Sequence, residues 1–552
     1  MSSNVLVLEQ NTQREHGRKA QLTSIHAGKT VGDIIRTTLG PQAMLKMLVD
    51  PMAGVVITSD GHSILRDIDT QHPSARTLVD IARAQDEECG DGTTAVVVLA
   101  AEFLSAAEPF IDRNMHPTQI VAAYFEFLEK ALKGLDDLSK SIDVNDRETM
   151  RALIKTAIGT KFISRWADLM VDLALQAVLI VMTENKGLTE VDLKKYARVE
   201  KIPGGEIETS YVLDGVMIKK DVIHGEMRRK IENPRIICLD TPLEYRKGES
   251  NTVSEVATAE DWDKLLRQED EYVKRLCEDL LKFKPDIVVT EKGVSEVASH
   301  ILYSHNVTVL RRLRKPDNIR LAKACGATII SRADEIREED VGTKCHLYEV
   351  RKIGDEYISF FEECEDPKAC SIILRGANKD VLNEVERNIQ DAMNVAKNIV
   401  LDPRVVPGGG AIEMAIACMV DEEGKKVEGA KQWPYRAAAR ALEVIPRTLA
   451  SNCGANVIRV ITELRAKHAQ GKEEASTFGI DGIEGTMVDM REYGIWEPLT
   501  VKTQCIKTAV EAACLLLRID DILSGMSVPK EGEGPKQDAD EEEMAEETLW
   551  GQ

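Results

Sequence analysis

The chain has 552 residues, several times the usual domain size, which predicts two to four domains with substantial cores. It is 43% hydrophobic and 30% charged, and its apolar runs are expected to fall short of the roughly 20 residues that span a bilayer, which argues against a membrane protein. A net charge of −22 and 4% aromatic residues argue against nucleic acid as the main partner, because phosphates attract basic surfaces and bases stack on aromatic rings.

The first residues lack the pattern of a signal peptide, and 11 cysteines, an odd number, are scattered over the whole length. Thiols without a paired framework are typical of a reducing compartment. We therefore expect a cytoplasmic protein.

Two regions, 17–145 and about 408–525, are rich in helical apolar periodicity. In the first, Ala27, Val31, Ile34 and Ile35 recur at helical spacing, and Gly40-Pro41 ends the run. The spacing predicts an amphipathic helix followed by a tight turn.

The middle region, 213–373, alternates β-branched runs with helical stretches. The runs are RIICL (235–239), DIVVT (286–290), TVLRR (308–312) and ATIIS (327–331), and a long amphipathic stretch from 260 to 285 separates the first two. This alternation predicts an inserted α/β domain. Helical stretches at 146–190 and 378–401 flank it, and the acidic tail from 526 is expected to be disordered.

The stretch CGDGTTAVV at 89–97 places a carboxylate between two glycines at the start of an apolar helix. A helix start with free backbone N–H groups favours an anion. Asp91 could hold Mg²⁺, Gly92 would let a phosphate approach, and Thr93 and Thr94 could donate hydroxyls. The alternative is an Asp-Gly turn with Thr93 as an ordinary helix cap.

A second glycine cluster, VVPGGGAIEMAIAC at 405–418, again leads into an apolar helix. Two such helix starts facing each other can form one phosphate site, although three glycines can also be a hinge. Asp60 follows a strand-like run and Gly40 ends a helix, and Asp60 alone would read as an Asx-turn residue.

Two further groups are ambiguous in the sequence. Asp391 lies beside the apolar stripe of its helix, where most carboxylates are simply solvated. Cys364 and Cys370 could form a disulfide loop or bind a metal ion, but two more ligands at matching spacing are not evident nearby, so we expect two free thiols.

Taken together, these motifs resemble the group II chaperonins over roughly residues 5–525. The stretches that carry the resemblance, in the family's order, are TTLGP, SDGHSIL, QDEECGDGTTAVVVLA, KYARVEKIPGG, ILRGA, LDPRVVPGGGAIE and DMREYGIWEPLTVK. KYARVEKIPGG, LEYRKGES, KQWPYRAAARALEVIPRTL and LLLRIDDILSG are further similar to one subunit type of the eukaryotic cytosolic chaperonin.

The resemblance implies a multidomain α and α/β chaperonin fold. Residues 1–145 and 408–525 would form a discontinuous helical equatorial ATP-binding domain, and residues 146–212 and 374–407 an intermediate domain. Residues 213–373 would form an α/β apical domain that binds client and carries a helical protrusion as a lid, and 526–552 a disordered tail.

The resemblance also assigns site residues, with ATP or ADP and Mg²⁺ as cofactors. Asp91 would hold Mg²⁺, Asp391 would be the catalytic aspartate that polarises the attacking water, and Asp60 a second carboxylate near the γ-phosphate. The nucleotide contacts would be Gly40, Pro41, Gly92, Thr93, Thr94, Thr160, Lys161, Gly408, Gly409, Gly482, Glu497 and Lys502. Ser59 and Ala95 depart from the residues common in the family, which puts the hydrolysis rate in question.

The implied function is an ATP-dependent protein-folding subunit in a double ring with seven other related subunits. It would bind unfolded polypeptides, with actin and tubulin as the clients that the family implies, and couple hydrolysis to closure of the lid. The alternatives are a ring subunit that binds nucleotide with little hydrolysis, and an independent ATP-using enzyme acting on a small metabolite.

Overall fold

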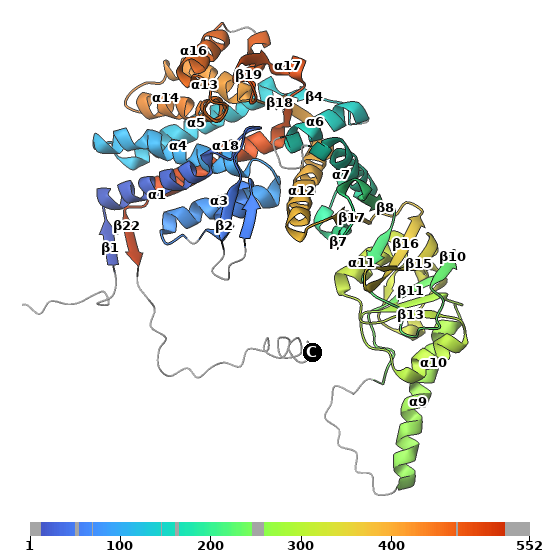
Figure 1. The fold of residues 1–552 in the computed structure, drawn as a ribbon. Coiled ribbons are helices and arrows are strands. Elements are labelled where there is room, and N and C mark those ends of the chain that lie inside the picture. The colour runs from blue at the N-terminus through green and yellow to red at the C-terminus, as the bar shows by residue number, and fades with distance from the viewer. Residues whose placement is uncertain are drawn as a thin grey trace, which may run out of the picture.

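A computed structural model describes residues 13–49, 55–68, 70–144, 146–159, 165–245, 259–470 and 473–524. Thr160, Lys161 and the acidic tail from 526 therefore lie outside the described residues. The described chain is organised around three large hydrophobic cores (Figure 1). The first draws on residues 25–135 and 406–517, the second on 150–212 and 370–405, and the third on 216–369.

The first core is built almost entirely from helices. They are α1 (Arg18–Arg36), α2 (Gly61–Asp67), α3 (Pro73–Glu88), α4 (Thr93–Asp112), α5 (Pro117–Leu138), α13 (Ala411–Gly424), α14 (Gln432–Ala441), α15 (Val444–Asn452), α16 (Val457–His468), α17 (Met490–Tyr493) and α18 (Leu499–Leu517). Helix α18, drawn in orange-red, runs among the blue helices of the first third of the chain (Figure 1). The two ends of the chain therefore build one core.

Helix α4 is the centre of this core. It packs against α1, α3, α14 and α18, and its apolar run extends round the helix because neighbours cover it on several sides. With 20 residues it is long and apolar enough to cross a membrane, which corrects the expectation that no apolar run approaches that length. Its burial by the surrounding helices explains this composition without a bilayer.

The second core joins the other two. Its helices and strands are β4 (Lys140–Ser141), α6 (Arg147–Gly159), α7 (Ala167–Val181), β5 (Thr183–Asn185), β6 (Leu188–Glu190), α8 (Leu193–Tyr196), β7 (Ala197–Pro203), β8 (Tyr211–Leu213), β17 (Cys370–Gly376), α12 (Lys379–Leu401), β18 (Arg404–Pro407) and β21 (Trp496–Pro498). The helical interpretation of 146–190 is wrong at its end. There β5 and β6 form a hairpin, because Lys186 and Gly187 both adopt positive φ in a two-residue turn.

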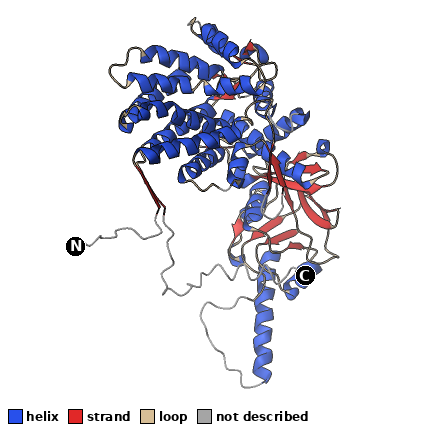
Figure 2. Cartoon of the chain, turned by 60° about the vertical axis from the view of Figure 1, so that its left-hand side comes forward, coloured by secondary structure: helices blue, strands red, loops and turns tan. Residues whose placement is uncertain are grey.

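The third core contains a parallel sheet in the order β13-β12-β11-β14, with helices α9 (Ala259–Leu281), α10 (Glu296–Ser304) and α11 (Lys315–Cys325). Its strands are β11 (Ile236–Leu239), β12 (Ile287–Thr290), β13 (Thr308–Leu310) and β14 (Ile329–Ile330). All four fall within runs that the sequence predicts as strands. The end of α9 farthest from the sheet projects away from the rest of the chain in both views (Figures 1 and 2).

A second sheet in this core was not predicted. Its order is β10-β15-β16-β9, with β9 (Val216–Ile218), β10 (Lys230–Glu232), β15 (Cys345–Ile353) and β16 (Glu356–Cys364). The β15–β16 hairpin carries charged residues such as Arg351 and Glu362, which pair across the strands at 2.7 Å. These charges interrupt the apolar alternation that would have indicated strands.

Two small antiparallel pairs belong to the first region. One pairs β1 (Gln13–His16) with β22 (Asp521–Ser524), which brings the two ends of the described chain together. The other is the hairpin of β2 (Lys46–Val49) and β3 (Val55–Thr58). This hairpin exposes apolar side chains, with Met47 65%, Val49 68% and Ile57 47% exposed. The remaining short pair is β19 (Phe478–Ile480) with β20 (Met487–Asp489).

Candidate functional site

Helix α4 begins at the GDGTT stretch. Its N-cap is Gly92, whose φ of +77° is a left-handed conformation that suits glycine, and no side chain caps the helix. The first N–H groups of α4 are thus left to favour an anion, together with the helix dipole. Thr93 is the first helical residue, so the alternative that it caps the helix is wrong.

Helices α13 and α18 also begin without a capping side chain. The N-cap of α13 is Gly410 with φ +75°, and that of α18 is Pro498. By contrast, α2, α3 and α5 are capped by the side chains of Asp60, His72 and His116. A capping side chain is therefore missing at the helix starts that follow or adjoin the two glycine clusters, as it is at the starts of α1, α14 and α15 in the same core.

The starts of α4, α13 and α18 lie close together. A Cβ at Gly92 would lie 3.2 Å from Cγ1 of Val501, in the first turn of α18, and a Cβ at Gly408 would lie 2.9 Å from Oε1 of Glu497. Strand β18, which leads into the second glycine cluster, also pairs with β21 just before α18. The N-terminus of α18 is thus the point where both glycine clusters meet.

A continuous set of contacts reaches the remaining predicted glycines. Ile480 N donates a 2.9 Å hydrogen bond to Gly409 O, and a Cβ at Gly482, two residues further on, would lie 2.3 Å from Pro41 Cγ. Gly40 lies on the other side of this contact, next to Pro41, with φ +92°. The structure therefore brings the 37–41 turn, the 478–482 strand end and the second glycine cluster together.

A buried ion-pair group lies beneath these helix starts. Lys502 Nζ lies 2.7 Å from Glu413 Oε1 and 2.6 Å from Glu497 Oε2, and the side chains of Lys502 and Glu413 are 9% and 2% exposed. Burial alone would lower the pKa of Lys502, but the two carboxylates outweigh it and raise the pKa. The pKa of Glu497 is raised, first by burial, and the charges of Glu413 and Asp91 contribute, so Asp91 lies within electrostatic range of this group.

Asp60 is firmly held at the start of α2. Its carboxylate accepts hydrogen bonds from Ser63 N at 2.9 Å, from His62 N at 3.3 Å and from Thr93 Oγ1 at 3.1 Å. The Asx-turn interpretation therefore describes its local role. The bond from Thr93 also ties Asp60 to the first turn of α4, which brings the two predicted residues together.

Asp391 lies on α12, in the second core. Asn394 and Asn398 follow it at i+3 and i+7, which places all three residues on one face of the helix. Asn398 Nδ2 donates a 2.9 Å hydrogen bond to Cys89 O, and Asn394 fills the space beside Gly90, where a Cβ would lie 2.4 Å from Asn394 Cβ. The face of α12 that carries Asp391 thus docks against the loop that carries Asp91.

Asp391 also borders a large cleft of about 1180 Å³, with Asp86 and Asn394 nearby. Most of its lining comes from residues 192–203 and from α12, and it includes Lys194, Lys195 and Arg198. The described residues that line this cleft include none from the starts of α4, α13 or α18, so it is distinct from the place where those helix starts converge. It leaves Asp391 accessible from one side of the junction.

Several residues of this region carry no signal in the sequence. Gln85 Nε2 holds the loop by a 3.0 Å bond to Asp91 O, and Asn452 Nδ2 holds the 37–41 turn by bonds to Arg36 O and Leu39 O. Glu413 is the third such residue, because it lies so far from Lys502 in the sequence that their ion pair leaves no local pattern. Only QDEECGDG, which places Gln85 six residues before Asp91, could have suggested a part of this set.

Comparison with known proteins identifies the family. The model of the TCP-1/cpn60 chaperonin family matches residues 31–527. The chain belongs to the TCP-1/cpn60 chaperonin family. This chaperonin is 58% identical to T-complex protein 1 subunit gamma of Mus musculus over 521 residues, covering 94% of this chain and 95% of the relative.

Other relatives show the same extent of similarity. The chaperonin is 57% identical over 534 residues to subunit gamma of Xenopus laevis, covering 97% of each chain. It is 55% identical over 526 residues to subunit gamma of Schizosaccharomyces pombe, covering 95% of this chain and 99% of the relative. These findings confirm the expected chaperonin fold, the function of an ATP-dependent protein-folding subunit and the resemblance to one subunit type, which is gamma.

Proposed function

We propose that this chaperonin subunit binds and hydrolyses Mg-ATP where the starts of α4, α13 and α18 converge, and uses hydrolysis to move the third core and its projecting helix. The observation that carries the proposal is the pair of glycine clusters meeting at the N-terminus of α18. The two clusters lie far apart in the sequence, so only the tertiary fold brings them together. Each of the three helix starts also offers backbone N–H groups that no side chain caps.

The residues present fit a nucleotide. Positive φ at Gly92, Gly409 and Gly410 turns the chain into α4 and α13 without a Cβ at these positions. Buried polar atoms near these helix starts, Gln85 Oε1 and Glu413 Oε2, have no hydrogen-bond partner among the described residues. Such atoms are typical of a site that a polar ligand or water completes.

We assign the phosphates to Gly92, Thr93, Thr94, Gly408 and Gly409, the metal ion to Asp91, and the remaining nucleotide contacts to Gly40, Pro41, Gly482, Glu497 and Lys502. Mg²⁺ held by Asp91 would neutralise charge on the phosphate oxygens. Asp60 would hold Thr93 in place through their hydrogen bond and face the terminal phosphate. Thr160 and Lys161, predicted as further contacts, stay predictions.

Asp391 is the general base of the proposal. A carboxylate that accepts a proton from the attacking water contributes through its position, and α12 supplies that position through Asn394 and Asn398. Asp391 belongs to the second core and Asp91 to the first. A small rotation of α12 therefore changes the distance between base and phosphate, which couples hydrolysis to domain movement.

We propose that the first core is the equatorial domain, the second the intermediate domain and the third the client-binding apical domain, with α9 as part of the lid. The exposed β2–β3 hairpin and the open edges of the β1–β22 pair would contact neighbouring subunits in the ring. We further propose that this subunit assembles with seven other related subunits, binds unfolded polypeptide clients and is located in the cytoplasm.

The test compares Asp391→Ala and Asp91→Ala in the assembled ring, with Gln390→Ala as a control in the exposed neighbour of Asp391. Covalent labelling of this chain by a photoreactive ATP analogue reports binding, and phosphate release reports turnover. Asp391→Ala should keep labelling and lower turnover at this chain's sites by about 10²–10⁴-fold. Asp91→Ala should lose labelling.

Equal loss of labelling in both aspartate variants would contradict the division of roles. Unchanged turnover with Asp391→Ala, when labelling is intact, would favour the alternative of a ring subunit that binds nucleotide with little hydrolysis.

A further inference from the structure

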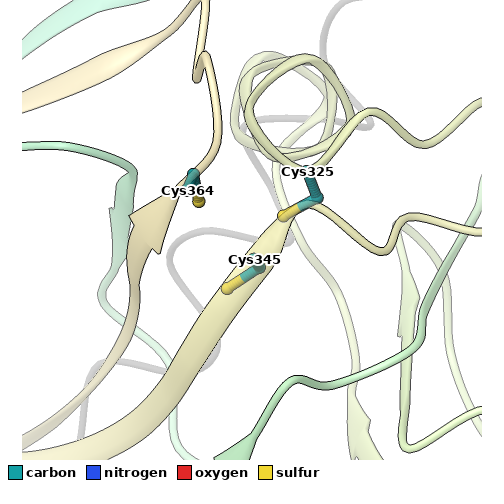
Figure 3. A group of neighbouring side chains, drawn as sticks. All are labelled: Cys325, Cys345 and Cys364. Atoms are coloured by element: carbon teal, nitrogen blue, oxygen red, sulfur yellow. The ribbon is translucent and has the colours of Figure 1, made fainter.

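Three cysteines far apart in the sequence meet inside the third core. Cys325 ends α11, Cys345 begins β15 and Cys364 ends β16, and their sulfur atoms all lie within 4.8 Å of one another (Figure 3). The side chains converge from three different elements, and Cys345 and Cys364 are cross-strand partners. All three are buried.

The structure groups Cys364 with Cys325 and Cys345 rather than with Cys370, its neighbour in the sequence. Cys364 and Cys370 are both free thiols, as expected, but they face different cores: Cys370 lies in the second core and Cys364 in the third. The additional ligands that the sequence did not show are Cys325 and Cys345. They lie 39 and 19 positions before Cys364, and these separations match no known ligand-spacing motif.

The electrostatics of the group differ from those of other buried thiols in the same core. Burial raises the pKa of Cys277 to about 11 and that of Cys238 to about 12, as it does for a thiol packed as a small apolar group. The pKa of Cys345 is instead lowered, because the thiols of Cys325 and Cys364 donate hydrogen bonds to it.

The spacing suits a metal ion better than a disulfide. Sulfur atoms bound to one ion at a Zn–S distance of about 2.3 Å lie roughly 3.8–4.0 Å apart, so each pair would close by less than about 1 Å from the 4.8 Å limit. A disulfide needs sulfurs about 2.05 Å apart and would leave the third cysteine unused. Thiolate sulfurs select soft cations such as Zn²⁺ and Cu⁺.

We propose that Cys325, Cys345 and Cys364 form a binding site for a thiophilic d¹⁰ cation that ties the end of α11 to the β15–β16 hairpin. Each coordinating sulfur releases its proton when the ion binds. Three thiolates and a divalent ion leave one negative charge in the core, whereas a monovalent ion leaves two, so Zn²⁺ is favoured over Cu⁺. The proposal is independent of the nucleotide site.

The experiment uses the assembled ring that contains the full chain, purified without chelator and analysed for metals by mass spectrometry. The Cys345→Ser ring should contain one metal ion fewer per copy of this chain than the wild-type ring. The Cys277→Ser ring, altered at a buried cysteine of the same core outside the cluster, should keep it. Equal metal content in the Cys345→Ser and wild-type rings overturns the proposal.

A second measurement covers the case in which Cys345→Ser fails to assemble. The wild-type ring is loaded separately with Zn²⁺ and with Cu⁺, washed with a weak chelator, and its retained metal is examined by X-ray absorption. A coordination shell of three sulfurs is expected, and the metal whose edge shows it identifies the ion. A ring that retains neither ion, or holds it only by nitrogen and oxygen, overturns the proposal.

Discussion

The side-chain amide of Asn398 donates a 2.9 Å hydrogen bond to the main-chain oxygen of Cys89. Cys89 lies two residues before Asp91, so this hydrogen bond joins the second core to the first core beside Asp91. Asn394, one turn earlier on α12, closes against Gly90. Asp391 is therefore not placed by its own surroundings alone. Its position relative to the glycine loop depends on two amides on the same helix face.

Asn398→Ala should slow turnover with little effect on nucleotide binding. A neutral hydrogen bond contributes about 0.5–1.5 kcal/mol, which corresponds to a several-fold loss in rate if it is needed to position Asp391. The measurement is kcat and KM of the assembled ring. Asn383→Ala is the matched control, because Asn383 lies on the same helix but accepts a hydrogen bond from Lys201. A change in KM alone would show that Asn398 does not position the base.

Lys502→Met should destabilise the helix starts of α13 and α18 strongly. Removing one partner of a buried ion pair leaves Glu413 without compensation and costs about 3–5 kcal/mol. Hydrogen exchange of the α13 and α18 amides measures the local opening. The exposed pair of Lys133 and Glu129 supplies the control, since Lys133→Met should leave the exchange of these amides almost unchanged. Similar effects of Lys502→Met and Lys133→Met on hydrogen exchange would show that burial does not determine how much an ion pair contributes to local stability.

Met47→Lys combined with Val49→Lys should prevent assembly into the ring without unfolding the chain. Both side chains are exposed on the β2–β3 hairpin, so the charges cost little in the free chain and much in an apolar interface. Native mass and sedimentation measure assembly. Ile458→Lys is the control, because Ile458 is 82% exposed on α16, away from the hairpin. Assembly of the double variant at the wild-type level would exclude the hairpin as a subunit contact.

Two histidines of the first core should respond to pH in opposite directions. The pKa of His62 is raised, first by its hydrogen bond to Asp86, so its contribution to stability is full below its unfolded value near 6.5 and is lost as pH rises through the folded pKa. The pKa of His468 is lowered by burial, so its contribution is full above 6.5 and is lost as pH falls.

The measurement is the difference in unfolding free energy between wild type and His62→Gln from pH 5 to 8, with His468→Gln alongside. The wild-type advantage over His62→Gln should shrink as pH rises, and that over His468→Gln should grow. Parallel profiles for the two variants would contradict the assignment of charge to His62 and neutrality to His468.

Local patterns in the sequence predict local structure well. The first predicted helix ends at Arg36, four residues before the predicted stop at Gly40-Pro41. That helix, the helix of Asp391 and the four strands of the parallel sheet each carry their own periodicity, because burial on one face repeats with the period of the element. The two glycine turns are also predictable, since positive φ at a helix start favours glycine.

Contacts between distant segments leave no such signal. Glu413 and Lys502 pair across 89 positions, and either residue alone reads as an ordinary surface charge. The cysteines at 325, 345 and 364 follow no ligand spacing, because the ends of two central strands and of one helix bring them together rather than one loop. The hairpin at 183–190 was missed because the apolar run of α7 continues almost to its turn.

The sharing of one core between the two ends of the chain has a consequence for synthesis on the ribosome. Helices α1 to α5 are complete by residue 138, but their partners begin only at residue 406, so roughly 270 residues must be added first, about 15–55 s at 5–20 residues per second. During that interval the faces of α4 that α14 and α18 later cover are bare on the nascent chain. A subunit that assists the folding of others thus itself emerges with an apolar surface that stays uncovered until roughly the last quarter of its chain is translated.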